Sequence, residues 1–96
     1  MPVTVLALTS LRPGGDAALA QYLAVVGPLM QAAGARLLSR HPVKETLAGA
    51  GAGFVSLVEY PDRAAIGAVF DHPDYRALQP VKDQAFTRYE VCVLGE

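Results

Sequence analysis

Residues 54–62, FVSLVEYPD, contain the end of one element and the start of the next, and they decide the fold. Their aromatic and β-branched residues predict a β-strand over Phe54–Tyr60. Pro61 cannot continue the hydrogen-bond ladder of a strand. Asp62 directly after it is a favoured N-cap, and the apolar residues spaced through 66–70 predict that a helix follows. The sequence therefore predicts a strand that turns directly into a helix.

The chain before this strand predicts a strand, a helix and a second strand. Val3–Leu11 is apolar on both alternating faces, which is typical of a strand that is covered on both sides. Residues 16–33 repeat apolar side chains at steps of three and four, which predicts a helix with one apolar stripe. Pro28 is expected to kink or break that helix. The next strand is predicted from Arg36 to His41 and is followed by a glycine-rich connection.

The chain after Asp62 predicts a second helical region and a last strand. The chain restarts at His72, and Pro73 suits the first turn of a helix, so we expect this region in two pieces. Pro80 is expected to interrupt the apolar stripe of the second piece. The last strand is predicted over Tyr89–Leu94. The order β-α-β-β-α-β, over a single domain of residues 1–96, predicts an α+β fold. Its four strands should form one antiparallel sheet with both helices on one face.

The composition indicates how the other face of the sheet is covered. The chain is 52% hydrophobic and 18% charged, which is apolar for 96 residues. We therefore expect a second copy to cover the open face and the two sheets to pack into a barrel, as a homodimer. The net charge of −1 and the lack of a basic block predict no nucleic-acid or membrane partner. Cys92 is the only cysteine; we expect it in the core, and the protein in the cytoplasm.

Five segments carry a family resemblance: YLAVVGPL (22–29), GARLLSR (34–40), VEYPD (58–62), HPDYRALQP (72–80) and VLGE (93–96). In order and spacing they resemble the domain-of-unknown-function 1330 family, in the dimeric α+β barrel superfamily. The resemblance runs from about Val3 to Glu96. It implies a ferredoxin-like fold and a homodimer, but no particular reaction. Cofactor-free monooxygenases, polyketide cyclases and muconolactone isomerases belong to the superfamily and share a pocket between sheet and helices.

His72 and Tyr75 are the candidate catalytic residues. The family commonly has serine at the position of His72. A histidine at the N-terminal end of a helix is held neutral by the helix dipole, so it suits a general base. Tyr75 lies one turn further along and can face the same space. The alternative is a helix cap beside a core tyrosine.

The candidate ligand-binding residues lie on two neighbouring strands. Strict alternation places Arg36 and Arg40 on one face, where they could hold a carboxylate by bidentate hydrogen bonds. The alternative is an ion pair with Glu59, Glu45 or the dimer mate. His41 and Glu59 are opposite each other if the hairpin turns near Ala50, and the carboxylate would then orient the imidazole. The alternative is a structural histidine.

Two functions remain open from the sequence. The first is binding or transforming a small acidic or phenolic metabolite in a pocket between sheet and helices; whether the protein is an enzyme stays open. The second is a non-catalytic dimeric structural or interaction module. No spacing of histidine and cysteine predicts a metal site, and the alternating glycines at 49–53 lead into a strand rather than a helix, so no cofactor is predicted.

Overall fold

The computed structural model describes residues 1–95; Glu96, the last residue of the family resemblance and of the predicted domain, lies outside the described part. In chain order the elements are β1 (Val3–Leu11), α1 (Asp16–Ala32), β2 (Arg36–Pro42), β3 (Phe54–Tyr60), α2 (Arg63–Phe70), α3 (Pro73–Arg76), α4 (Gln79–Ala85) and β4 (Phe86–Val93).

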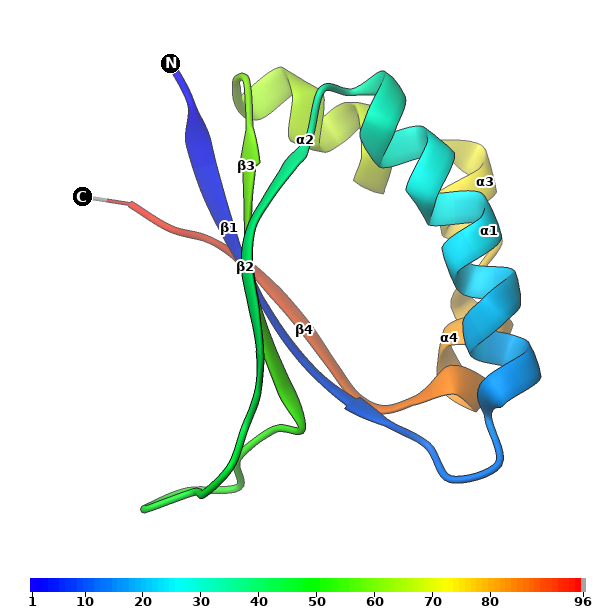
Figure 1. The fold of residues 1–96 in the computed structure, drawn as a ribbon. Coiled ribbons are helices and arrows are strands. Elements are labelled where there is room, and N and C mark those ends of the chain that lie inside the picture. Colours follow the sequence, from blue (N-terminus) through cyan, green and yellow to red (C-terminus); the bar gives the residue numbers. More distant parts are fainter. Residues whose placement is uncertain (96) are drawn as a thin grey trace.

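Within residues 1–95 four strands form one sheet in the order β2-β3-β1-β4, and each neighbouring pair is antiparallel. Figure 1 shows the sheet nearly edge-on, with the helices on one side of it and none on the other. The central strands β1 and β3 are far apart in sequence, but they pair from Val3 with Tyr60 to Thr9 with Phe54. The predicted α+β fold is confirmed.

The first helix, α1, is continuous through Pro28, so of the predicted kink or break the break does not occur. Proline removes one backbone donor, which leaves the carbonyl of Ala24 without its helical partner. Both residues are exposed, so water can satisfy that carbonyl. The helix ends where Gly34, with a φ of 77°, adopts the left-handed conformation that favours glycine.

The second helical region has three pieces instead of the predicted two. Asp62 caps α2 as expected, because its Oδ1 accepts a hydrogen bond from the Ala65 N–H at 2.8 Å. Pro80 lies in the first turn of α4, where the backbone needs no donor. The proline therefore begins a helix, and α3 is left as a separate turn.

The core lies between the sheet and the helices. Its buried residues come from every helix and from three strands: Val5, Ala18, Tyr22, Val26, Val58, Tyr60, Ile66, Val69, Tyr75, Leu78, Ala85 and Phe86. Within the described residues no helix is long and apolar enough to cross a membrane.

The open face of the sheet, which carries no helix in Figure 1, is apolar at its centre. Leu6 pairs with Leu57, and Leu8 pairs with Val55, on neighbouring strands of this face. Cys92 on β4, the other neighbour of β1, also pairs with Leu6 and is exposed. The prediction that this cysteine is a core residue is therefore wrong within one chain, because its strand alternation places it on the side without helices.

Candidate functional site

A cavity of about 280 Å³ lies between the sheet and the helices. Its floor comes from all four strands, and its roof comes mainly from α1. Most of the lining is apolar: Val5, Ala7, Leu11, Leu19, Leu23, Val26, Met30, Leu37, Val58, Val69, Phe70, Phe86 and Val91. An engineered cavity of ~150 Å³ holds benzene, so this one has room for a substituted ring.

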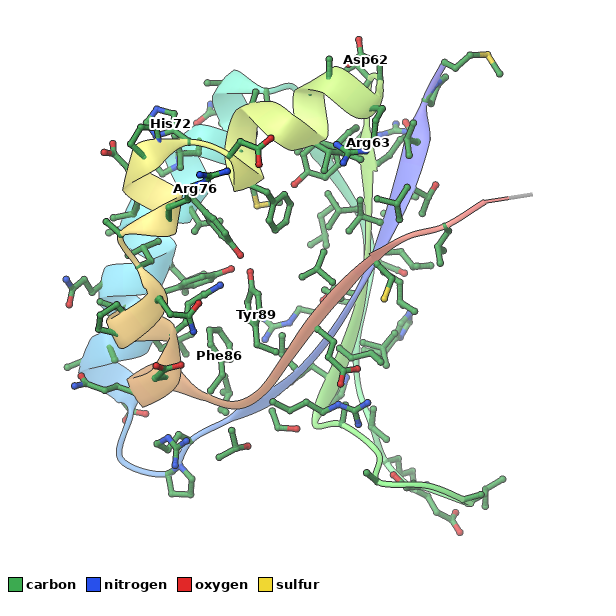
Figure 2. The ribbon with its side chains drawn as sticks, turned by 180° about the vertical axis from the view of Figure 1, so that it is seen from behind. Asp62, Arg63, His72, Arg76, Phe86 and Tyr89 are labelled. Atoms are coloured by element: carbon green, nitrogen blue, oxygen red, sulfur yellow. The ribbon has the colours of Figure 1, made fainter. Side chains whose placement is uncertain are left out.

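Few polar side chains line the cavity, and two of them, both phenols, belong to a hydrogen-bonded chain of three tyrosines. Tyr22 on α1 and Tyr89 on β4 line the cavity, and their hydroxyl oxygens lie 2.7 Å apart. The Tyr75 hydroxyl on α3 lies 2.8 Å from that of Tyr89. The three hydroxyls therefore form one hydrogen-bonded chain, with Tyr89 in the middle. Figure 2 shows Tyr89 pointing from β4 into the space between sheet and helices.

Aromatic packing holds these phenols in place. The rings of Tyr22 and Phe86 meet edge to face with 5.1 Å between centroids, and those of Tyr22 and Tyr89 meet at 5.9 Å. Phe70 packs in the same manner on Tyr75 at 4.9 Å. Rings in such contacts lose little further freedom when the hydroxyls pair, so the chain is preorganised.

Burial raises the pKa of Tyr22 and Tyr89, the two members of the chain that line the cavity. Desolvation raises the pKa of Tyr22 from 10.0 to about 12, although the hydrogen bond with Tyr89 lowers it in part. Desolvation and the neighbouring phenols raise the pKa of Tyr89 further, and burial raises that of Tyr60. At neutral pH Tyr22 and Tyr89 are therefore hydroxyl groups that both donate and accept.

Lys82 on α4 adds a cation at the Tyr75 end of the hydrogen-bonded tyrosine chain. Its Nζ donates to the Tyr75 hydroxyl at 3.2 Å. The same Nζ lies 4.7 Å from the ring centroid of Tyr75 and 4.5 Å from that of Tyr89, within cation–π range. Lys82 is half-buried, and among residues 1–95 no carboxylate lies within 4.0 Å of it.

Arg40 lines the cavity, whereas Arg36 does not. The register between β2 and β3 shifts between Leu37 and Ser39, so that Arg40 pairs with Ser56 on the helix side. Arg36 pairs with Glu59 on the open face, where its Nη2 donates to Oε1 at 3.0 Å. The prediction that the two arginines share a face is wrong, because a bulge adds one residue and reverses the alternation.

Arg40 is also held by an aromatic ring. Its guanidinium carbon lies 4.5 Å from the ring centroid of Phe54. The side chain is exposed, and so are Leu23 and Leu37, which line the cavity as well. Arg40 is therefore a charged group at an otherwise apolar edge of the cavity, where it can meet an anionic substituent.

His41 and Glu59 do not lie opposite each other. His41 pairs with Val55, four residues before the position of Glu59 on β3. Glu59 has Arg36 as its partner instead. The predicted base–orienter pair is therefore not formed. The hairpin pairs Pro42 with Phe54, and this register between β2 and β3 differs from the one that would place His41 opposite Glu59.

His72 caps α3 on the outside of the molecule. Its Nδ1 accepts the Asp74 N–H at 3.1 Å, and the side chain is 38% exposed. Figure 2 shows it on the outer side of the helix layer, and it is not among the residues that line the cavity. His72 and Tyr75 are one turn apart, yet the tyrosine points inward. A catalytic role for His72 stays a prediction.

Sequence reasoning missed the tyrosine chain and Lys82. Tyr22 belongs to the apolar stripe of α1, and Tyr89 shares a strand face with Val91, so each pattern by itself indicates only a core or interface aromatic. A buried phenol needs a hydrogen-bond partner, and three tyrosines on core-facing positions were the available indication. Within residues 1–95 no three histidine, cysteine or acidic side chains gather where they could hold a metal ion.

A four-stranded antiparallel sheet with helices on one face, and a cavity between them, defines a ferredoxin-like α+β protein. The sequence model of the family described as domain of unknown function, DUF1330, matches residues 4–95. The chain belongs to this family. No protein with a curated description matches it significantly.

Solved structures show the same fold. The methylated RPA0582 protein of Rhodopseudomonas palustris is 25% identical, with a TM-score of 0.81 over 99% of this chain and 80% of its own. Rv0793 from Mycobacterium tuberculosis is 27% identical, with a TM-score of 0.61 over 100% and 95%. A dimeric ferredoxin-like protein of unknown function from Jannaschia sp. CCS1 is 14% identical, with a TM-score of 0.67 over 100% of both chains.

Proposed function

We propose that this protein is a homodimer that binds a small, mainly apolar metabolite with an acidic or phenolic group in the cavity between sheet and helices. The observation that carries the proposal is the cavity itself. It is about 280 Å³ and is lined mostly by apolar side chains; the polar side chains that line it are Thr9, Tyr22, Arg40, Ser56, Tyr60 and Tyr89. Sites for small molecules commonly combine an apolar wall with few placed polar groups.

The homodimer is supported by the open face of the sheet. Leu6, Leu8, Val55 and Leu57 form its apolar centre, and no helix covers them. Two similar folds, from Jannaschia and Thermobifida fusca, are described as dimeric. A second copy placed face to face would bury this surface on both chains. One cysteine and no intrachain disulfide fit a reducing cytoplasm, which we propose as the compartment.

A thermal-shift screen of the purified protein tests ligand binding. Small carboxylates, phenols and lactones are added at millimolar concentration. A ligand at 100 times its Kd adds ~2.7 kcal/mol to the folded state, which raises the Tm of a domain of this size on the order of 10 °C. We expect one chemical class to shift the Tm. A flat screen across all three classes would refute the proposal and favour a purely structural module.

Two arginine variants locate the site. Arg40→Ala should weaken binding of the anionic ligands found in the screen, because Arg40 lines the cavity. Arg36→Ala is the matched control, since its side chain lies on the open face with Glu59. Light scattering on both variants checks that the oligomer is unchanged. Equal losses of affinity in the two variants would contradict the assignment of Arg40 to the cavity.

Light scattering also tests the dimer. Leu57→Arg places a charge in the middle of the open face and should give a folded monomer. Gln31→Arg is the control, because Gln31 is an exposed residue of α1 on the helix side. A monomeric parent protein, or a Leu57→Arg protein that remains a dimer, would rule out this interface.

A further inference from the structure

The tyrosine chain has one more proton than it uses. Three hydroxyls carry three protons, and the two bonds Tyr22–Tyr89 and Tyr89–Tyr75 use two of them. One hydroxyl therefore always has a proton free for an outside acceptor. Lys82 adds a donor to Tyr75 and accepts nothing. The cluster therefore keeps one unused donor, which suits an oxygen with lone pairs and no proton of its own to offer.

The position of Lys82 favours one donor-to-acceptor direction along the hydrogen-bonded tyrosine chain. Because Lys82 donates to the Tyr75 oxygen, the Tyr75 proton is directed away from the cation and toward Tyr89. Tyr89 then donates to Tyr22, and the Tyr22 proton is the one left free. Tyr22 lines the cavity, whereas Tyr75 does not. The free donor is consequently presented to the side where a ligand would lie.

The charge at the cluster is positive and unbalanced. The groups that contact the Lys82 Nζ from the neighbouring elements are the phenols of Tyr75 from α3 and Tyr89 from β4. On its own helix, Asp83 accepts from Gln79 instead of pairing with Lys82. Burial raises the pKa values of Tyr22 and Tyr89, so these phenols supply no negative charge at neutral pH. An anionic ligand would balance the lysine.

We infer that the cavity binds its ligand's phenol or enol as the oxyanion, with Tyr22 donating the hydrogen bond and Lys82 acting as a positioning residue through Tyr75 and Tyr89. This rests on the proposed function and narrows its ligand class. The ionisation breaks the ligand's O–H bond, leaves the electron pair on oxygen and releases the proton to the buffer. The apolar wall opposes the charge, and the nearby cation offsets that cost.

Titration with para-nitrophenol tests the inference, because its anion absorbs visible light and its neutral form does not. At a pH where the free dye is mostly protonated, adding the protein should produce the anion band. Tyr22→Phe removes a hydrogen bond to a charged oxygen and should weaken anion binding about ten- to a hundred-fold. Lys82→Met keeps an unbranched side chain, removes the cation and should lower the bound anion fraction by about ten-fold. Lys44→Met, at the exposed second lysine, should change neither.

The outcomes separate this inference from the proposed function. Equilibrium dialysis measures total binding independently of the dye's colour. Dye that binds without the anion band, or a band that survives Lys82→Met, overturns the inference and leaves the proposed function standing. A protein that binds neither para-nitrophenol nor any compound of the thermal screen overturns both. A band that is lost in the tyrosine and lysine variants, with each still folded by circular dichroism, supports the inference.

Discussion

The central position of Tyr89 makes a quantitative prediction for stability. Tyr89→Phe keeps the aromatic ring and removes the hydroxyl that bonds to both Tyr22 and Tyr75. Tyr22→Phe removes only the end of the chain and leaves the bond between Tyr89 and Tyr75. A hydrogen bond of this kind contributes ~1 kcal/mol net, so the expected losses in unfolding free energy are ~2 kcal/mol for Tyr89→Phe and ~1 kcal/mol for Tyr22→Phe.

Urea unfolding measures this difference. Both variants are compared with the parent at one protein concentration, because dimerisation couples stability to concentration. The midpoint should fall about twice as far for Tyr89→Phe, with an unchanged dependence on urea. By heating, each ~1 kcal/mol corresponds to ~4–8 °C in Tm for a domain of this size. Equal losses in the two variants would refute the account of Tyr89 as the central link of the chain.

Three further predictions concern pH, a helix cap and two glycines. The pKa of Tyr22 is 10.0 in the unfolded state and about 12 in the folded state, so the unfolded state loses this proton first as the pH rises. The unfolding free energy should therefore fall by ~1.4 kcal/mol per pH unit between those two values, which urea titrations at alkaline pH measure. A parent protein whose stability falls no more steeply with pH than that of Tyr22→Phe would contradict the burial of this phenol. Asp62→Ala should cost ~1 kcal/mol because it removes the cap of α2, while Asp62→Asn should retain most of the stability; equal Tm values for the two variants would argue against the cap. Gly15→Ala should cost ~1–3 kcal/mol of unfolding free energy, because the added Cβ would press on the Gln84 carbonyl oxygen. Gly27→Ala meets open space within α1 and should stabilise the protein by ~0.5–1 kcal/mol. Thermal melts in which both variants change the Tm in the same direction would contradict this packing.

Local patterns were sufficient to predict the order of the elements. The switch after Tyr60, from alternating residues to a capped helix, appears in the structure with Asp62 as the cap. Gly34, in the left-handed conformation, ends α1 in the way a glycine after an apolar stripe commonly does. These features depend on neighbours in sequence, and for that reason they can be predicted without knowing the tertiary structure.

The site residues were harder to place, because a small irregularity changes which side a residue faces. Alternation predicted one face for Arg36 and Arg40, and a single bulge between them separates the two side chains. The pairing of His41 depended on a hairpin length that the glycine-rich connection does not define. Nothing in the local sequence indicates either feature, because both follow from how β2 fits against β3.

The hydroxyl chain was out of reach for a different reason. Tyr22 and Tyr89 are 67 residues apart, and Tyr75 and Tyr89 are 14 apart. Each tyrosine by itself fits a core position, so the pattern of each element is already explained without the others. Only the packing of α1, α3 and β4 shows that the three hydroxyls meet.

The account is tested most directly by a crystal structure of the protein grown with the tightest-binding phenol from the thermal screen. It predicts density for the ring inside the cavity, with the phenol oxygen within hydrogen-bond distance of the Tyr22 hydroxyl. Density on the outer surface, for example beside His72, together with an empty cavity would contradict it.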